Sequence, residues 1–307
     1  MAVREKKNAV LLTVLASLIW GTSFPGTKWG LGFVGNDVFF LLLRFLVACA
    51  ITISIVLYLG KLRLSIFKEP MMWAIGAFNA AGFVLQYVGL NDSTGYGTTA
   101  SKTALLVDIN VVAVAIISYF MFKERLGRIQ TAGIVCGMVG VVFISLNKDL
   151  VFDPKQIVGD VLVYLAGWSW AFFIVFNKKM LSRYSGVEIS SAAITTCAVW
   201  LVLPSSFLFA TGADFSIEPL GWMMVVYLGL FCTSVATLLW ALGLEGVSAT
   251  ASATIMLIEV VTALVLSITL LKETLSVAAT FGAVLVMLAI YLVSGTGIGE
   301  KEPVKSA

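Results

Sequence analysis

Histidine is absent from the chain, and charged residues make up only 12% of its 307 positions. The first absence removes the commonest general base and the commonest metal ligand together. Soluble domains carry about a quarter charged residues, so the second absence argues against an ordinary water-soluble protein. The net charge of +3 is spread along the chain and forms no basic patch. We therefore expect no nucleic-acid partner, no metal site and no cofactor.

Cysteine is also scarce, and the spacing of the cysteines matches no metal-binding or redox motif. The four cysteines stand singly inside apolar runs, and no C-x-x-C pair occurs: Cys49, Cys136, Cys197 and Cys232. Isolated cysteines in apolar sequence usually behave as small hydrophobic packing residues. We expect that role here rather than metal binding or redox activity.

Long apolar runs dominate the chain, which is 60% hydrophobic. A bilayer core requires about 20 apolar residues per helix. Runs of that size cover residues 8–31, 37–59, 72–90, 98–122, 127–146, 157–178, 187–211, 219–244, 248–271 and 277–295. The sequence therefore predicts an all-α integral membrane protein with ten transmembrane helices in a lipid bilayer.

An internal repeat relates the two halves of the chain. Shifting the sequence by 149 residues overlays 122–145 on 271–294, with eight of the 24 positions identical. Five predicted spans separate equivalent points, and because five is odd the second copy enters the membrane upside down. We expect two inverted-topology five-helix repeats around a central cavity, at 8–146 and 157–295. Cytoplasmic tails, 1–7 and 296–307, would flank them.

Inverted repeats are typical of secondary transporters, whose substrate site lies near the bilayer midplane between the halves. The chain has no ATP-hydrolysing motif. The pattern indicates a secondary transporter that moves a small-molecule substrate by alternating access, and not an enzyme. Two alternatives remain open: an organic-cation or drug carrier, and a non-transporting lipid-flipping or membrane-enzyme subunit.

Several short motifs give the chain a recognisable likeness. They are Trp20-Gly21, Arg44-Phe45, Thr98-Thr99-Ala100-Ser101-Lys102 and Lys123-Glu124-Arg125-Leu126. With the two five-helix repeats, these motifs resemble the EamA-type transporters of the drug/metabolite transporter superfamily, over nearly the whole chain. The resemblance implies a basket of helices from both halves around a cavity, and export of amino acids or related metabolites. Two features depart from it: Val111 and Val260 replace the usual prolines, and an insertion occupies 91–97.

Among the charged side chains within the predicted spans, five are candidates for the site: Lys28, Arg44, Lys102, Asp108 and Glu259. On insertion scales each costs about 2.5–3.5 kcal/mol at a helix centre. Such residues must pair with each other, line water or extend to the membrane surface, and they are functional candidates by default. For Lys28 and Lys102, near span ends, snorkelling is the competing explanation. For Arg44 it is a structural tie to a carbonyl or to Asp108.

In the alignment of the two repeats, Glu259 overlays Asn110, which is two residues after Asp108. The two acidic residues therefore occupy nearly equivalent positions in the two halves. We expect Asp108, Asn110 and Glu259 at a midplane site. A coupling proton, or a counter-substrate, is an expected partner, and Glu259 is the expected proton carrier because burial favours the neutral carboxyl.

Neutral candidates complete the predicted site. Asn79 and Gln86 are seven residues apart and therefore share one helix face, although packing between helices would also explain them. Trp20, Trp168 and Trp170 are expected to wall the cavity, although interfacial anchoring is the commoner role of membrane tryptophan. In the resulting hypothesis, a zwitterion places its carboxylate at Arg44 or Lys102 and its amine at Glu259 or Asp108.

Basic residues predict the orientation, since cytoplasmic loops carry an excess of lysine and arginine. With the N-terminus inside, inner segments hold fourteen of them: Arg4, Lys6, Lys7, Lys61, Arg63, Lys68, Lys123, Arg125, Arg128, Lys178, Lys179, Arg183, Lys301 and Lys305. Outer segments hold three: Lys148, Lys155 and Lys272. The expected location is the cell membrane, with both termini cytoplasmic.

Tags at the two termini test this topology. Both tags should resist a protease added to intact cells and be cleaved once the membrane is permeabilised. Tags on opposite faces of the membrane would contradict the ten-span count and the inverted repeat together.

Overall fold

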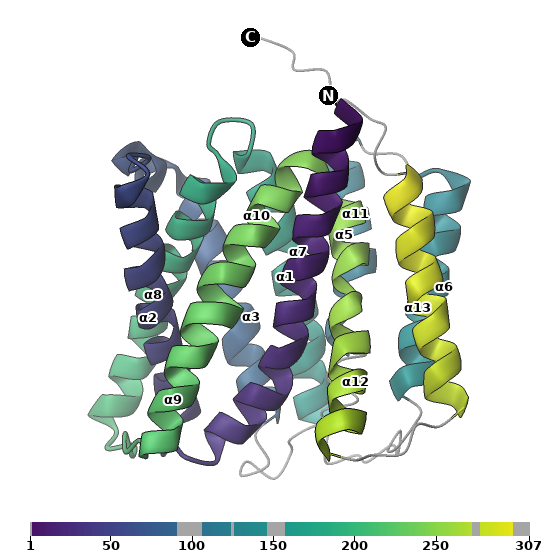
Figure 1. Cartoon of the computed structure of the whole chain (residues 1–307). Coiled ribbons are helices and arrows are strands. Elements are labelled where there is room, and N and C mark those ends of the chain that lie inside the picture. Colours follow the sequence, from purple (N-terminus) through teal and green to yellow (C-terminus); the bar gives the residue numbers. More distant parts are fainter. Residues whose placement is uncertain (1, 91–105, 124–125, 146–156, 272–276, 297–307) are drawn as a thin grey trace.

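A computed structural model describes residues 2–90, 106–123, 126–145, 157–271 and 277–296. These residues form a bundle of helices standing side by side (Figure 1). Within these ranges there is no β-strand, only an isolated antiparallel bridge between Val34 and Ile217. The all-helical class predicted from the sequence is confirmed.

The helices in chain order are α1 (Ala2–Leu31), α2 (Asp37–Tyr58), the 3₁₀ helix η1 (Leu64–Lys68), α3 (Pro70–Leu90), α5 (Asn110–Phe122), α6 (Arg128–Ser145), α7 (Ile157–Met180), α8 (Gly186–Ala210), α9 (Pro219–Tyr227), the π-helix η4 (Leu228–Val235), α10 (Ala236–Gly246), α11 (Ala249–Met256), α12 (Ile258–Leu271) and α13 (Val277–Thr296). Six helical segments are long and apolar enough to cross a membrane, and four shorter ones accompany them. The six lie within the predicted spans or a few residues beyond them.

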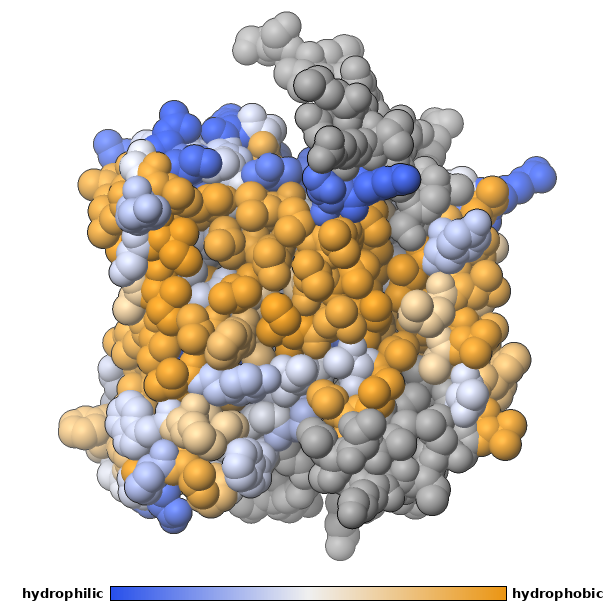
Figure 2. All heavy atoms as spheres, in the orientation of Figure 1, coloured by the Kyte–Doolittle hydropathy of each residue, from blue (hydrophilic) through white to orange (hydrophobic). Residues whose placement is uncertain are grey.

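An apolar belt crosses the middle of the face seen in Figure 2, and hydrophilic residues gather along the edge where α1 begins. We call this end the N-terminal face and the other end the opposite face. Large apolar side chains such as Phe207, Phe209 and Tyr291 are strongly exposed. In water such a belt would be costly, whereas in a bilayer it contacts lipid.

Helix packing follows the same pattern in both halves of the chain. In the first half, α3 packs against α7 and α8. In the second half, η4 and α10 pack against α1, and η4 also packs against α2. Likewise α5 packs against α7 and α12 against α1. α2 packs on α8, and α6 packs on α13 at one side of the bundle (Figure 1). Each contact has a counterpart when the halves are exchanged.

Two predicted spans are interrupted, where the sequence predicts continuous helices over 98–122 and 248–271. A turn at Asp108 and Ile109 precedes α5, and Leu257 separates α11 from α12. At both interruptions an i→i+3 bond replaces the α-helical one: Val111 N–H donates to the Asp108 carbonyl at 3.1 Å, and Val260 N–H to the Leu257 carbonyl at 3.2 Å. Both members of the second pair lie 149 residues after those of the first, and no proline is needed for either break.

The span predicted at 219–244 is helical throughout but changes type in the middle. Residues Leu228–Val235 form the π-helix η4 between α9 and α10. The hydroxyls of Thr233 and Ser234 each donate to the carbonyl five residues earlier, at 2.9 Å. Short π-helical segments within α-helices are rare and occur frequently at functional sites.

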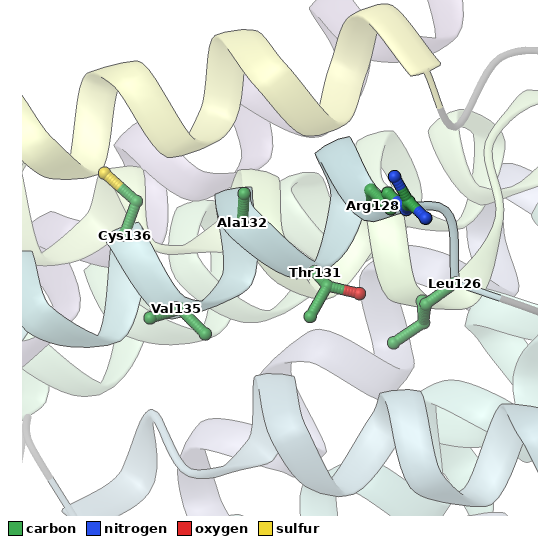
Figure 3. A pocket seen from close by; sticks show the side chains of 6 residues that line it. All are labelled: Leu126, Arg128, Thr131, Ala132, Val135 and Cys136. Carbon is green, nitrogen blue, oxygen red and sulfur yellow. The ribbon is translucent and has the colours of Figure 1, made fainter.

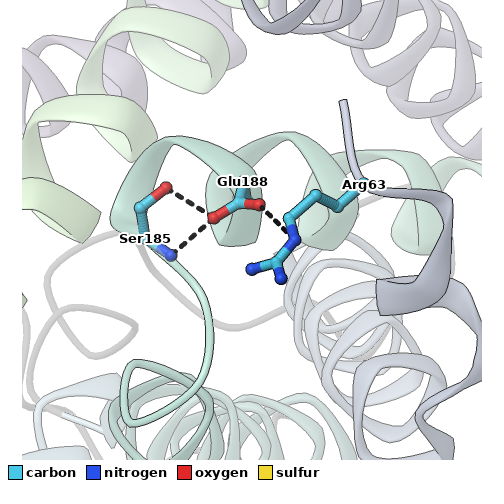
Figure 4. Close-up of polar contacts among 3 residues, drawn as sticks. All are labelled: Arg63, Ser185 and Glu188. Carbon is cyan, nitrogen blue, oxygen red and sulfur yellow. Dashed lines mark hydrogen bonds and ion pairs between the residues drawn. The ribbon is translucent and has the colours of Figure 1, made fainter. Parts of the chain in front are cut away.

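Ion pairs link the two halves at the N-terminal face. Arg63 lies 3.6 Å from Glu188, and Arg183 lies 3.2 Å from Glu69. Glu188 also accepts hydrogen bonds from the backbone N–H and the hydroxyl of Ser185, both at 2.8 Å (Figure 4). The same carboxylate thus caps the start of α8 and holds the α2–α3 connection.

Backbone hydrogen bonds link the halves at the opposite face. Gly35 N–H donates to the Ser216 carbonyl at 2.9 Å, and Glu218 N–H donates to the Phe33 carbonyl at 3.0 Å. Nearby, the Asp214 carboxylate accepts from the backbone N–H and the hydroxyl of Ser216, which lowers the pKa of the exposed Asp214 carboxyl. The short α1–α2 and α8–α9 connections therefore form a two-stranded contact.

Replacing Glu188 with alanine should destabilise the protein by about 1–2 kcal/mol, because the start of α8 loses its capping box. Arg63→Ala serves as the control, since the Arg63 side chain is 58% exposed and exposed ion pairs contribute about 0–1 kcal/mol. Thermal melting in detergent measures both variants. Equal losses would show that the ion pair, and not the cap, is the important contact.

Candidate functional site

Arg44 on α2 lies in the interior of the bundle with only 1% of its surface exposed. Its Nε donates to the Thr233 hydroxyl of η4 at 2.7 Å, and its Nη1 lies 3.4 Å from the Tyr87 hydroxyl of α3. Its guanidinium carbon lies 5.1 Å from the ring centroid of Phe83. Among the described residues no carboxylate pairs with Arg44, and the tie to Asp108 or to a carbonyl that was the competing explanation for Arg44 is absent there.

Phe83 extends the environment of Arg44 to α7. Its ring meets that of Trp170 edge-on, with centroids 5.3 Å apart, and that of Tyr87 at 6.4 Å. Arg44 and Trp170, two predicted site residues from different halves, therefore contact the same aromatic ring.

Trp20 connects α1 to the same region. Its indole Nε1 donates to the backbone carbonyl of Cys232 in η4 at 2.8 Å, one residue before the threonine that holds Arg44. The ring lies 6.0 Å from that of Trp240, which stacks on Phe173 at 5.2 Å and donates to the Ser252 hydroxyl at 3.0 Å. Trp20 is thus fixed inside the bundle and is not an interfacial anchor.

The predicted acidic residues come together at the two helix breaks. Asp108, Asn110 and Glu259 are 2%, 4% and 8% exposed, and α11 packs against α5, so the two breaks lie close to each other. Within the described part of the chain, Asp108 Oδ2 and Asn110 Oδ1 are buried without a hydrogen-bond partner. The sequence predicts continuous helices around both acids; instead Asp108 lies in a turn and Glu259 in the first turn of α12.

Glycines let the breaks approach the first helix of the opposite half. A Cβ at Gly21 of α1 would lie 2.8 Å from the Glu259 carbonyl and 2.5 Å from Thr262. A Cβ at Gly167 of α7 would lie 2.7 Å from the Val107 carbonyl. Close packing of this kind is what small residues permit between membrane helices.

The remaining predicted residues have mixed outcomes. Asn79 and Gln86 are buried on α3. Trp168 is partly buried against the apolar core. Lys28 lies near the end of α1, but its side chain falls outside what the structure describes, as does the whole of Lys102.

Sequence reasoning missed the residues that hold Arg44 and Trp20. Thr233, Tyr87, Phe83 and Trp240 all stand in apolar runs, where they look like ordinary core residues. The sequence could have suggested that a hydroxyl group contacts Arg44. It does not indicate which one, because nothing in it signals the π-helix that brings Thr233 to Arg44.

Two hollows lie on the surface of the bundle. One, of about 590 Å³, lies along α6 and is lined by Leu126, Arg128, Thr131, Ala132, Val135 and Cys136 (Figure 3). The other, of about 280 Å³, lies between α1 and the α9–η4 junction, at Thr22 and Tyr227. Neither is lined by a charged candidate of the predicted site.

The fold and the buried polar residues can now be compared with known proteins. The model of the EamA-like transporter family matches residues 7–146 and residues 157–295. The chain belongs to the EamA-like transporter family. It is accordingly a multi-pass membrane transporter, and the resemblance inferred from its motifs is confirmed.

Named relatives of this EamA-like transporter are also transporters. It is 26% identical to the uncharacterized transporter YoaV of Bacillus subtilis, covering 92% of this chain and 96% of that one. It is 28% identical to an uncharacterized transporter of Archaeoglobus fulgidus, with 92% and 97% covered. A probable amino-acid metabolite efflux pump of Salmonella typhimurium is 25% identical, with 92% and 93% covered.

A solved crystal structure shares the fold of this EamA-like transporter. The TM-score is 0.78 at 19% sequence identity, covering 94% of this chain and 97% of the other. At this identity the likeness concerns the fold alone.

Replacing Gly21 with alanine should destabilise this transporter by about 1–3 kcal/mol, because the added methyl overpacks the contact with Glu259 and Thr262. Gly32→Ala is the matched control, since its nearest neighbour would be the Trp29 carbonyl at 3.4 Å. Melting in detergent compares the two. A Gly21 variant as stable as the control would refute the close approach of α1 to α12.

Proposed function

We propose that this protein is a secondary transporter that exports amino acids or related small zwitterionic metabolites by alternating access. The observation that carries the proposal is Arg44, which is buried in the bundle without an acidic partner among the described residues. A buried charge without a counter-ion is strongly unfavourable. A substrate carboxylate that arrives and leaves would supply the missing negative charge.

The acidic residues at the helix breaks suit the ammonium group of a zwitterion, whose carboxylate would lie at Arg44. Asp108 and Glu259 are acidic and buried at the two helix breaks, so an ammonium group between them would supply a positive charge to their carboxylates. The buried Asn110 amide oxygen, which has no hydrogen-bond partner in the described region, adds an acceptor for an N–H donor. The helix α1 links the two sites, because Trp20 bonds to the Cys232 carbonyl of η4 and the next residue, Gly21, packs against the Glu259 carbonyl.

Equivalent helix breaks support the inverted repeat on which alternating access depends. Broken helices at the midplane of inverted repeats are a common design for substrate and ion sites. Here the i→i+3 turns at Asp108 and Leu257 are separated by the same 149 residues as the sequence repeat. The exchangeable packing of the halves, with α3 on α7 and α10 on α1, agrees with that symmetry.

The efflux direction and the substrate class draw on the relatives. Two of them, from Salmonella typhimurium and Escherichia coli, are named probable amino-acid metabolite efflux pumps. In the proposed mechanism protons compete with the substrate ammonium for Glu259. Substrate leaving on one side therefore permits a proton to enter from the other.

An organic-cation carrier is the second candidate, because the Trp20, Trp240 and Phe173 rings form an aromatic cluster inside the bundle. Aromatic faces bind quaternary ammonium groups. Arg44 counts against this candidate, since a buried cation repels a cationic substrate.

Transport by purified protein in liposomes tests the proposal, after a thermal-shift screen of the amino acids has chosen the probe, because a ligand of the folded form raises its melting point. Arg44→Ala should reduce exchange of that amino acid at least about tenfold, as expected for the loss of a charge-assisted contact. Glu259→Gln should abolish the acceleration of export by an inward proton gradient.

Arg63→Ala, a change in an exposed arginine, controls for the loss of one positive charge. Wild-type behaviour of both Arg44→Ala and Glu259→Gln would end the proposal. Inhibition by choline, but by none of the amino acids, would instead favour the organic-cation carrier.

A further inference from the structure

The π-helix η4 contacts α2 at the level of Arg44. A Cβ on Gly229 would lie 2.8 Å from both the Arg44 carbonyl and the Val47 side chain, so the two backbones are in close contact. Each residue advances a helix by about 100°. The extra residue of a π-turn therefore rotates everything that follows it, and here it directs Thr233 toward the guanidinium.

Thr233 is held in a fixed orientation by its own bond. Its hydroxyl donates to the Leu228 carbonyl, five residues earlier, at 2.9 Å. A hydroxyl has one donor and two acceptor positions, so the oxygen remains free to accept from Arg44 Nε, at 2.7 Å. The direction of both hydrogen bonds is thereby determined.

These contacts decide which part of Arg44 a ligand can reach. A guanidinium has five N–H donors, and two of them are engaged, by Thr233 and, at the long distance of 3.4 Å, by Tyr87. In the described part of the chain the other donors have no partner. Because Nε is occupied, a carboxylate can form a bidentate pair only with the two terminal nitrogens of the guanidinium.

We propose that Thr233 is the positioning residue that makes Arg44 a receptor for a substrate carboxylate, by holding Nε and presenting the two terminal nitrogens. This inference rests on the proposed function and names the group that the site recognises. The same π-turn places the Cys232 carbonyl where Trp20 Nε1 bonds to it at 2.8 Å. One segment of the second half thus orients two candidate substrate residues of the first.

Thr233→Val tests the inference, with Thr233→Ser as the conservative variant that restores the hydroxyl. Binding of the amino acid chosen by the thermal-shift screen should weaken about tenfold or more in Thr233→Val, the effect of losing a hydrogen bond to a charged group. Binding of the methyl ester of that amino acid should not change, because it has no carboxylate. Thr233→Ser should bind the acid as the wild type does.

Thr52→Val is the matched control for loss of a buried hydroxyl. Thr52 is 2% exposed on α2 and bonds to the Ala48 carbonyl of its own helix at 2.9 Å. It should bind both probes normally. Equal weakening of acid and ester binding in Thr233→Val would overturn the inference, because it would indicate a general disturbance of the site.

A second measurement needs no ligand. The protein has six arginines, which can be labelled with ¹⁵N. Hydrogen exchange at Arg44 Nε–H should be slow in the wild type and in Thr233→Ser, and fast in Thr233→Val. Arg44→Lys identifies the resonance. Unchanged exchange in Thr233→Val would overturn the inference.

The two proposals fail in different ways. If Arg44→Ala binds the amino acid as well as the wild type does, the proposed function fails. If Arg44→Ala loses binding while Thr233→Val keeps it, Arg44 acts without help from Thr233 and only the present inference fails.

Discussion

A guanidinium charge in the middle of an apolar bundle is the constraint on which the central structure depends. Arg44 is fully buried, and its described contacts are a hydroxyl, a phenol and an aromatic ring. None of these neutralises a charge, and in a medium of low dielectric constant the remaining field is strong. In the proposed function, α2, α3 and η4 therefore enclose a site for the carboxylate of the substrate.

The backbone faces a related constraint at the two helix breaks. In a bilayer every N–H and carbonyl must find a partner within the protein, and a broken helix leaves some of them free. Short i→i+3 bonds close the turns at Asp108 and Leu257. Gly21 and Gly167 bring the first helix of each half against the carbonyls of the other half's broken helix. The breaks are therefore enclosed by protein and placed next to the acidic residues.

Hydropathy was sufficient to predict the helices because a bilayer imposes a length and an apolar composition on each one. The predicted span 37–59 corresponds to α2 at Asp37–Tyr58, and 157–178 corresponds to α7 at Ile157–Met180. The breaks at Asp108 and Leu257 were not predicted, since the sequence there is as apolar and helix-compatible as its surroundings and contains no proline.

The candidate site, like the fold, could be predicted from the sequence only in part. Charged residues in apolar sequence are conspicuous, so Arg44, Asp108 and Glu259 could be selected from their cost in lipid alone. Their partners could not be selected, because contacts such as Arg44 with Thr233 join residues 189 positions apart and depend on the rotation of one helix. A threonine in an apolar run becomes informative only when that rotation is known.

The two faces of the bundle are fastened by different chemistry. At the N-terminal face the halves meet through Arg63–Glu188 and Arg183–Glu69, with both arginines largely exposed. At the opposite face they meet through backbone hydrogen bonds around Val34 and Ile217. Salt screens exposed charges, with a Debye length of about 8 Å at physiological ionic strength, but leaves amide–carbonyl bonds nearly unaffected. Higher ionic strength should thus weaken the contacts at one end of the molecule selectively. In the proposed alternating-access cycle, the two openings would therefore respond differently to the electrolyte on each side.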